Sequence, residues 1–80
     1  MKALPDSVEQ RLAAGDNEYA RSARHLLPSP EELSLTPPYE RVLHAILDLA
    51  NGDWRLVRHY SQAACEDWRD VLLWSSQASP

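Results

Sequence analysis

Apolar residues recur along most of this chain with the three- and four-residue spacing of amphipathic helices. Over residues 53–75 the spacing alternates strictly and places Trp54, Val57, Ser61, Ala64, Trp68, Val71 and Ser75 on one stripe. Residues 37–50 carry a second apolar face, made of Tyr39, Val42, Leu43, Ile46, Leu49 and Ala50. Residues 7–27 carry a third, made of Val8, Leu12, Gly15, Tyr19, Ala23 and Leu26. The pattern predicts three long helices.

Capping and helix-breaking residues bound these segments. Ser7, Thr36 and Asp53 stand where N-caps are expected, with Pro37 in the first turn of the second helix. Pro28 ends the first helix, and Asn51–Gly52 ends the second because both residue types accept the left-handed conformation. The short step from Gly52 to Asp53 predicts that the second and third helices form an antiparallel hairpin.

Gly15 leaves two interpretations of the first segment. The apolar phase continues across the glycine, which favours one helix over residues 7–27 with Gly15 facing a neighbour. The alternative is two helices, with Gly15 as the stop and Asp16 or Asn17 as the new cap, because glycine costs about 1 kcal/mol inside a helix.

The stretch between Pro28 and Pro38 predicts one short helical turn over residues 30–34. Ser29 is its cap and Pro30 its first helical residue. Leu33 and Leu35 are then expected to fold this connector onto the core.

The fold expected for residues 1–80 is therefore a single all-α domain. It is a small three-helix bundle in which the first helix packs across the hairpin of the other two, with the short turn between them. The expected core is Val8, Leu12, Tyr19, Leu26, Val42, Leu43, Ile46, Leu49, Trp54, Val57, Ala64, Trp68, Val71 and Leu72.

The tripeptide Asp-Trp-Arg occurs twice, at residues 53–55 and 67–69. In one straight helix the two tryptophans point the same way, roughly 21 Å apart along the axis. Because the chain has no phenylalanine, we interpret both tryptophans as core-filling residues. A duplicated ligand site is the alternative.

Composition narrows the class of protein. The net charge of −4 disfavours a general role on nucleic acid or on anionic membranes. One cysteine, Cys65, excludes an internal disulfide. We find no signal-peptide pattern and no apolar run long enough to span a membrane, so a cytoplasmic location is expected.

Two similar triads are the best candidate polar features. Arg55, Arg58 and His59 share a face near the start of the third helix, and Arg21, Arg24 and His25 repeat the spacing in the first. The planar guanidinium group of arginine donates paired hydrogen bonds to phosphates and carboxylates, so these residues form a possible anion-binding face. A solvated helix face is the simpler interpretation.

Catalytic and metal motifs are not found. The histidines and Cys65 show no metal-ligand spacing, and two glycines do not make a phosphate loop. No cofactor and no enzymatic activity are predicted. A composite site of His44, His59 and Cys65 would require these groups to meet in one cleft.

The run Val71-Leu72-Leu73-Trp74 has more apolar residues than one helix face absorbs. Leu73 and Trp74 point away from the stripe, with Trp74 near the phase of Leu56. Exposed apolar clusters mark interfaces, so Leu56, Leu73 and Trp74 are the predicted interface. The expected function is a non-enzymatic interaction or regulatory module that forms a homodimer or docks on a protein partner. The alternative is an anion- or nucleic-acid-binding helical domain.

Overall fold

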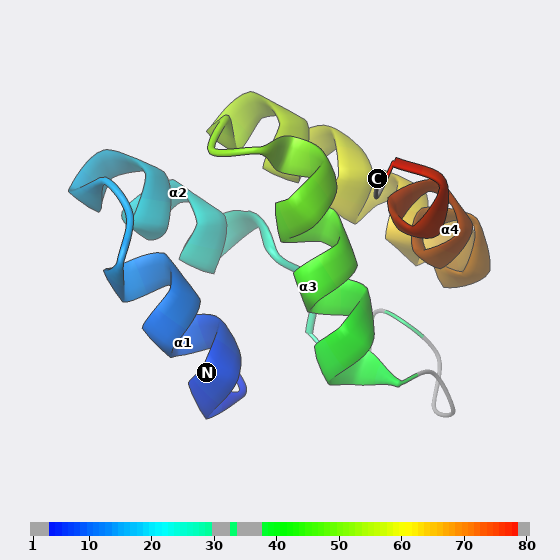
Figure 1. Cartoon of the computed structure of the whole chain (residues 1–80), viewed down its shortest axis with the longest axis horizontal. Coiled ribbons are helices and arrows are strands. Elements are labelled where there is room, and N and C mark those ends of the chain that lie inside the picture. Colours follow the sequence, from blue (N-terminus) through cyan, green and yellow to red (C-terminus); the bar gives the residue numbers. More distant parts are fainter. Residues whose placement is uncertain (1–3, 30–32, 34–37, 79–80) are drawn as a thin grey trace.

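Four helices make up the secondary structure of residues 4–29, 33 and 38–78, the part of the chain that the computed structural model describes. They are α1 (Asp6–Ala13), α2 (Asn17–Leu26), α3 (Tyr39–Ala50) and α4 (Trp54–Ala78) (Figure 1). The radius of gyration, 11.4 Å, matches the ~11.6 Å expected for a compact chain of this length. The predicted all-helical fold is confirmed, but the described residues contain four helices where three were expected.

The predicted single helix over residues 7–27 is wrong, because the chain leaves the helix after Ala13 and restarts at Asn17. Asp16 is extended, with φ −64° and ψ 141°, and its carboxylate accepts a hydrogen bond from the Tyr19 backbone N–H. A Cβ on Gly15 would make only ordinary contacts, so the break does not depend on glycine. The cause is the Asp16 cap, as in the alternative interpretation.

The connector between α2 and α3 is anchored at both ends. The Tyr39 hydroxyl donates a 2.7 Å hydrogen bond to the Pro28 carbonyl oxygen, which ties the start of α3 to the end of α2. Leu33 is buried, as expected. The rest of the predicted turn over residues 30–34, together with Leu35, Thr36 and Pro37, lies outside the described residues.

Helix α3 lies between α1 and α4 and packs mainly against α4 (Figure 1). It ends as predicted: Asn51 is left-handed, with φ 50° and ψ 44°, and Gly52 has φ 85°. Glycine adopts such angles without strain. The turn sends α4 back along α3, and Asp53 starts the new helix.

Helix α4 is bent at Asp67, whose extended backbone (φ −156°, ψ 99°) separates segment 54–66 from segment 68–78. Asp53 and Asp67 each accept a hydrogen bond from the backbone N–H two residues on, at 2.9 Å from Arg55 and 3.1 Å from Arg69. Each arginine also lies beside its aspartate and 5.9 Å from the adjacent tryptophan ring. The repeated tripeptide therefore marks two helix starts, and the predicted straight helix is wrong.

Removing either capping carboxylate will weaken the fold. We expect Asp53→Ala and Asp67→Ala each to lower the free energy of unfolding by about 0.5–2 kcal/mol, because each leaves a helix start without its cap. Urea denaturation measures this. Arg55→Ala and Arg69→Ala are the controls, expected to cost under about 1 kcal/mol because their ion pairs are exposed. Aspartate variants as stable as the controls would contradict the capping role.

Most of the predicted core is buried, with one clear exception. Val8, Leu12, Val42, Leu43, Ile46, Val57, Ala64 and Val71 are fully buried, and Tyr19, Leu26, Leu49, Trp68 and Leu72 are partly buried. Trp54 is exposed, so its assignment to the core is wrong. Trp54 shares its helix stripe with the buried Val57 and Ala64, but it is the first residue of α4 and projects beyond the core at that end. Ala20, Leu27, Ala45 and Leu47 are also buried, although their spacing did not place them on an apolar face.

Candidate functional site

The bend in α4 creates an apolar surface from residues of both segments. Trp74 lies edge-on against Tyr60 with ring centroids 6.2 Å apart. In a straight helix these residues would be roughly 21 Å apart along the axis. Leu56 lies one turn from Tyr60 on the same face. Leu73 precedes Trp74 in the sequence and points about 100° around the helix from it. We call Leu56, Tyr60, Leu73 and Trp74 the α4 apolar surface.

The three residues predicted as an interface are all exposed. The exposed fractions are 54% for Leu73, 38% for Trp74 and 37% for Leu56. Trp54 is equally exposed, at 37%, but it lies about 160° around the helix from Leu56 and belongs to another face. Sequence analysis identified three members of the surface and missed Tyr60, because the contact with Trp74 exists only when the helix bends.

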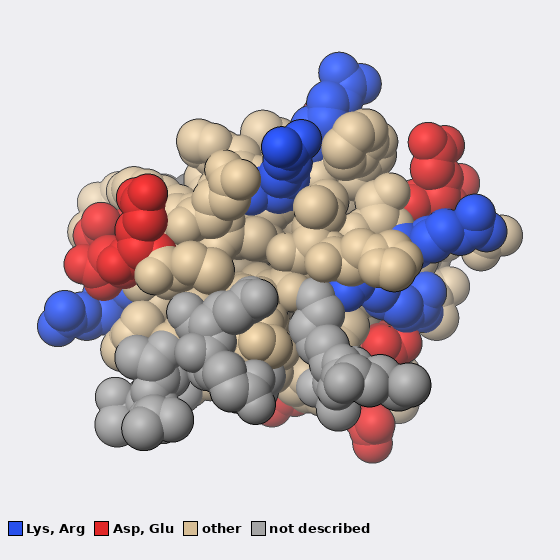
Figure 2. All heavy atoms as spheres, turned by 180° about the vertical axis from the view of Figure 1, so that it is seen from behind, with Lys and Arg blue, Asp and Glu red and all other residues tan. Residues whose placement is uncertain are grey.

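The structure separates most of the arginines proposed as an anion-binding face. Arg24 forms a 3.0 Å ion pair with Glu9 on α1, and Arg55 lies 3.8 Å from Asp53. His59 packs against Tyr60 with ring centroids 4.9 Å apart. Figure 2 shows Lys and Arg side chains at several places on one face, two of them adjoining, with Asp and Glu side chains to both sides.

Only one member of each triad reaches a shared hollow. This hollow, of about 280 Å³, lies between α2 and α4. Its lining residues are His25, Leu26, Arg58, Ser61, Gln62 and Cys65. Neither Arg21 nor Arg24 is among them. Ser61 was assigned to the apolar stripe by its spacing, and nothing in the sequence marks it as a polar group facing a hollow.

A chain of polar contacts joins α1 to α3, and sequence analysis did not foresee it. Arg11 Nη1 lies 3.2 Å from His44 Nδ1, and His44 Nε2 lies 3.0 Å from Ser7 Oγ. Ser7 donates in turn to the Glu40 carboxylate. Because a guanidinium only donates, Nδ1 must accept and Nε2 must carry the proton toward Ser7. His44 therefore does not act as a base toward the Ser7 hydroxyl in this arrangement.

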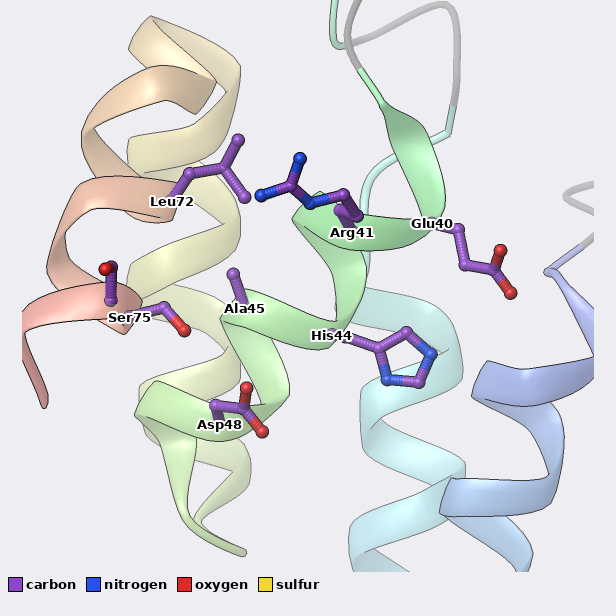
Figure 3. Close-up of a pocket in the computed structure, with 8 residues that line it drawn as sticks. Glu40, Arg41, His44, Ala45, Asp48, Leu72 and Ser75 are labelled. Carbon is purple, nitrogen blue, oxygen red and sulfur yellow. The ribbon is translucent and has the colours of Figure 1, made fainter. Parts of the chain in front are cut away.

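Beside this network, α3 and the second segment of α4 enclose a hollow of about 410 Å³. Figure 3 shows Arg41 extending from α3 toward Leu72, while Glu40 and His44 point the other way, toward α1. His44 lines this hollow, whereas Cys65 lines the one between α2 and α4. The composite site of His44, His59 and Cys65 thus does not form in one cleft.

Tyr19 makes stability depend on pH. Burial raises the pKa of its phenol above the ordinary value of 10.0, and the positive charge of Arg11 partly opposes this shift. In the unfolded chain the Tyr19 phenol therefore loses its proton at a lower pH than in the folded protein. The contribution of the neutral phenol to the free energy of unfolding is complete below pH 10.0 and is lost as pH rises through the folded pKa. We expect the stability loss between about pH 9 and pH 11 to be smaller in Tyr19→Phe than in the unmodified protein. Urea denaturation of both proteins at the two pH values measures this loss. An equal loss in Tyr19→Phe and in the unmodified protein would contradict this assignment.

No group of three or more His, Cys, Asp or Glu side chains among residues 4–29, 33 and 38–78 is arranged to hold a metal ion. None of the helices described combines the length and the apolar character of a membrane span.

Comparison of the chain with protein-family models, with curated proteins and with solved structures gives no match.

Proposed function

We propose that this protein is a non-enzymatic interaction module that forms a homodimer through the α4 apolar surface. The observation that carries the proposal is the contact between Trp74 and Tyr60 across the bend at Asp67. It brings the exposed Trp74 of the second segment against the partly buried Tyr60 of the first. A cytoplasmic location belongs to the same proposal, and a chain with a single cysteine, which forms no internal disulfide, fits a reducing compartment.

The apolar surface would gain stability from being covered. Burying apolar area yields about 25 cal/mol per Å², and large aromatic and aliphatic side chains supply most of that area in an interface. A chain of 80 residues without a disulfide has a stability of only a few kcal/mol. Association through Leu73 and Trp74 would therefore add appreciably to it.

The charges beside the surface favour a second copy of this chain as the partner. The helix stripe next to Leu56 and Tyr60 contains Arg55 and His59 at its start and Glu66 at its end. A two-fold axis that sets segment 54–66 of one copy antiparallel to that of the other brings the basic start opposite the acidic end. The four residues of the α4 apolar surface carry no charge, so dimerisation through them does not bury an unpaired charge.

The test compares two exposed sites on α4 by sedimentation equilibrium. Leu73→Glu places a carboxylate in the interface, and we expect the dimer affinity to fall roughly a hundredfold or more while helical content is unchanged. Trp54→Glu is the control, since it places the same charge at another exposed apolar residue of α4, on another face. We expect it to remain a dimer. Equal effects of the two variants would overturn the proposed surface.

Charge reversal distinguishes a second copy from an unrelated partner. Arg55→Glu places like charges opposite each other in the antiparallel dimer and weakens it, and adding Glu66→Arg in the same chain restores it. Failure of the double variant to restore association would contradict the antiparallel arrangement.

The alternative function, an anion- or nucleic-acid-binding domain using Arg21, Arg24, Arg55, Arg58 and His59 as one face, stays a prediction. The ion pairs of Arg24 and Arg55 and the packing of His59 against Tyr60 weigh against it.

A further inference from the structure

We infer that the hollow between α2 and α4 is a binding site for a phosphate group. Arg58, Ser61 and Gln62 line it from α4, and His25 lines it from α2. These side chains offer guanidinium, hydroxyl, amide and imidazole N–H or O–H donors, which suit the oxygens of a tetrahedral anion. The site is independent of the proposed dimer.

Ser61 is the observation that points to a ligand. Its side chain is only 5% exposed, and its Oγ has no hydrogen-bond partner. A serine within a helix usually bonds to a carbonyl of the preceding turn, and a buried hydroxyl without any partner is destabilising. The Oγ is shielded from solvent, so its side chain must rotate toward the hollow, which Ser61 also lines, before an oxygen of a bound phosphate accepts its hydrogen bond.

The charge around the hollow selects an anion. Among residues 4–29, 33 and 38–78, none that lines it carries a carboxylate, although the net charge of the protein is −4. The hollow between α3 and the second segment of α4 includes Asp48, and so does a third hollow, beside Tyr19 and the end of α3. Within the described part of the chain Arg58 forms no ion pair, in contrast to Arg24 and Arg55. Its guanidinium can therefore turn toward a ligand without losing an existing partner.

The hollow, of about 280 Å³, has room for one phosphate group with a small substituent. It contains a single arginine, which does not follow the backbone of a nucleic acid. Free phosphate and a phosphate monoester share this chemistry.

Inorganic phosphate and O-phosphoserine, titrated separately at constant ionic strength, test the site through backbone amide shifts of α2 and α4. We expect saturable binding, and Arg58→Ala should weaken it about tenfold. Arg55→Ala is the matched control: it removes the same charge from the same helix outside the hollow, and its affinity should stay within about twofold. Tighter binding of O-phosphoserine than of inorganic phosphate would identify a monoester as the ligand, and equal binding would identify free phosphate.

Ser61→Ala provides a second variant that keeps the helix intact. We expect it to fold normally and to bind phosphate more weakly, because the buried hydroxyl no longer contributes a hydrogen bond. Leu73→Glu, which tests the dimer, should bind phosphate as the unmodified protein does. Absence of saturable binding, or equal weakening by Arg58→Ala and Arg55→Ala, would overturn the inference.

Discussion

Replacing Leu43 by alanine will lower the free energy of unfolding by about 2–5 kcal/mol, a large part of what an 80-residue domain possesses. Leu43 is fully buried on α3, the helix that lies between α1 and α4. The substitution removes apolar contacts and leaves a cavity that helices on two sides cannot both close. We expect partial unfolding at room temperature.

The measurement for Leu43→Ala is urea denaturation followed by circular dichroism. Leu73→Glu is introduced as well, so that dimerisation does not contribute to the measured stability. Leu56→Ala in the same background is the control, expected to change stability by about 0.5 kcal/mol or less because the residue is exposed. A cost below about 1 kcal/mol for Leu43→Ala would contradict the burial of this side chain.

Leu33→Ala is expected to have the second large effect, again about 2–5 kcal/mol. Only 2% of the Leu33 surface is exposed, although the residue belongs to no helix. Connecting segments normally run over the surface and tolerate substitution. A large cost here therefore shows that the connector contributes a core residue.

The same denaturation experiment applies to Leu33→Ala, in the same background. Tyr39→Phe is a useful companion, because it removes the hydrogen bond to the Pro28 carbonyl and keeps the ring. We expect it to cost about 0.5–1.5 kcal/mol, less than Leu33→Ala. A reversed order would mean that the hydrogen bond, and not Leu33, holds the connector in place.

The sequence predicted the helical class and the end of α3 well, because both depend on local signals. Apolar spacing identified the buried face of α3, and Asn51–Gly52 supplied the left-handed turn. The break before α2 was harder to predict, since the apolar phase continues through Gly15 while α1 has already ended and the Asp16 cap starts a new helix. A periodic pattern does not report whether the backbone between two apolar residues is helical.

The bend at Asp67 shows the same difficulty with a larger consequence. The strict spacing over residues 53–75 predicts one straight helix, yet Asp67 repeats the capping bond of Asp53 and starts a second segment. The repeated tripeptide was the available signal. Its tryptophans indicate core packing, whereas the structure shows that the aspartate of each copy caps a helix start.

The candidate sites were predictable to different extents. The exposure of Leu56, Leu73 and Trp74 followed from helix phase, because too many apolar residues compete for one face. The contact of Trp74 with Tyr60 and the pairing of His25 with Arg58 in one hollow depend on how helices pack. Such relations between distant segments do not appear in spacing along a single helix.

The most direct test of the α4 apolar surface is a dilution series followed by the indole N–H signals of the three tryptophans. Because Trp74 lies in the proposed interface and Trp54 on another face, we predict that the Trp74 signal shifts with protein concentration while the Trp54 signal stays constant. A Trp74 signal that does not move up to near-millimolar protein, or a Trp54 signal that moves in its place, would contradict self-association through this surface.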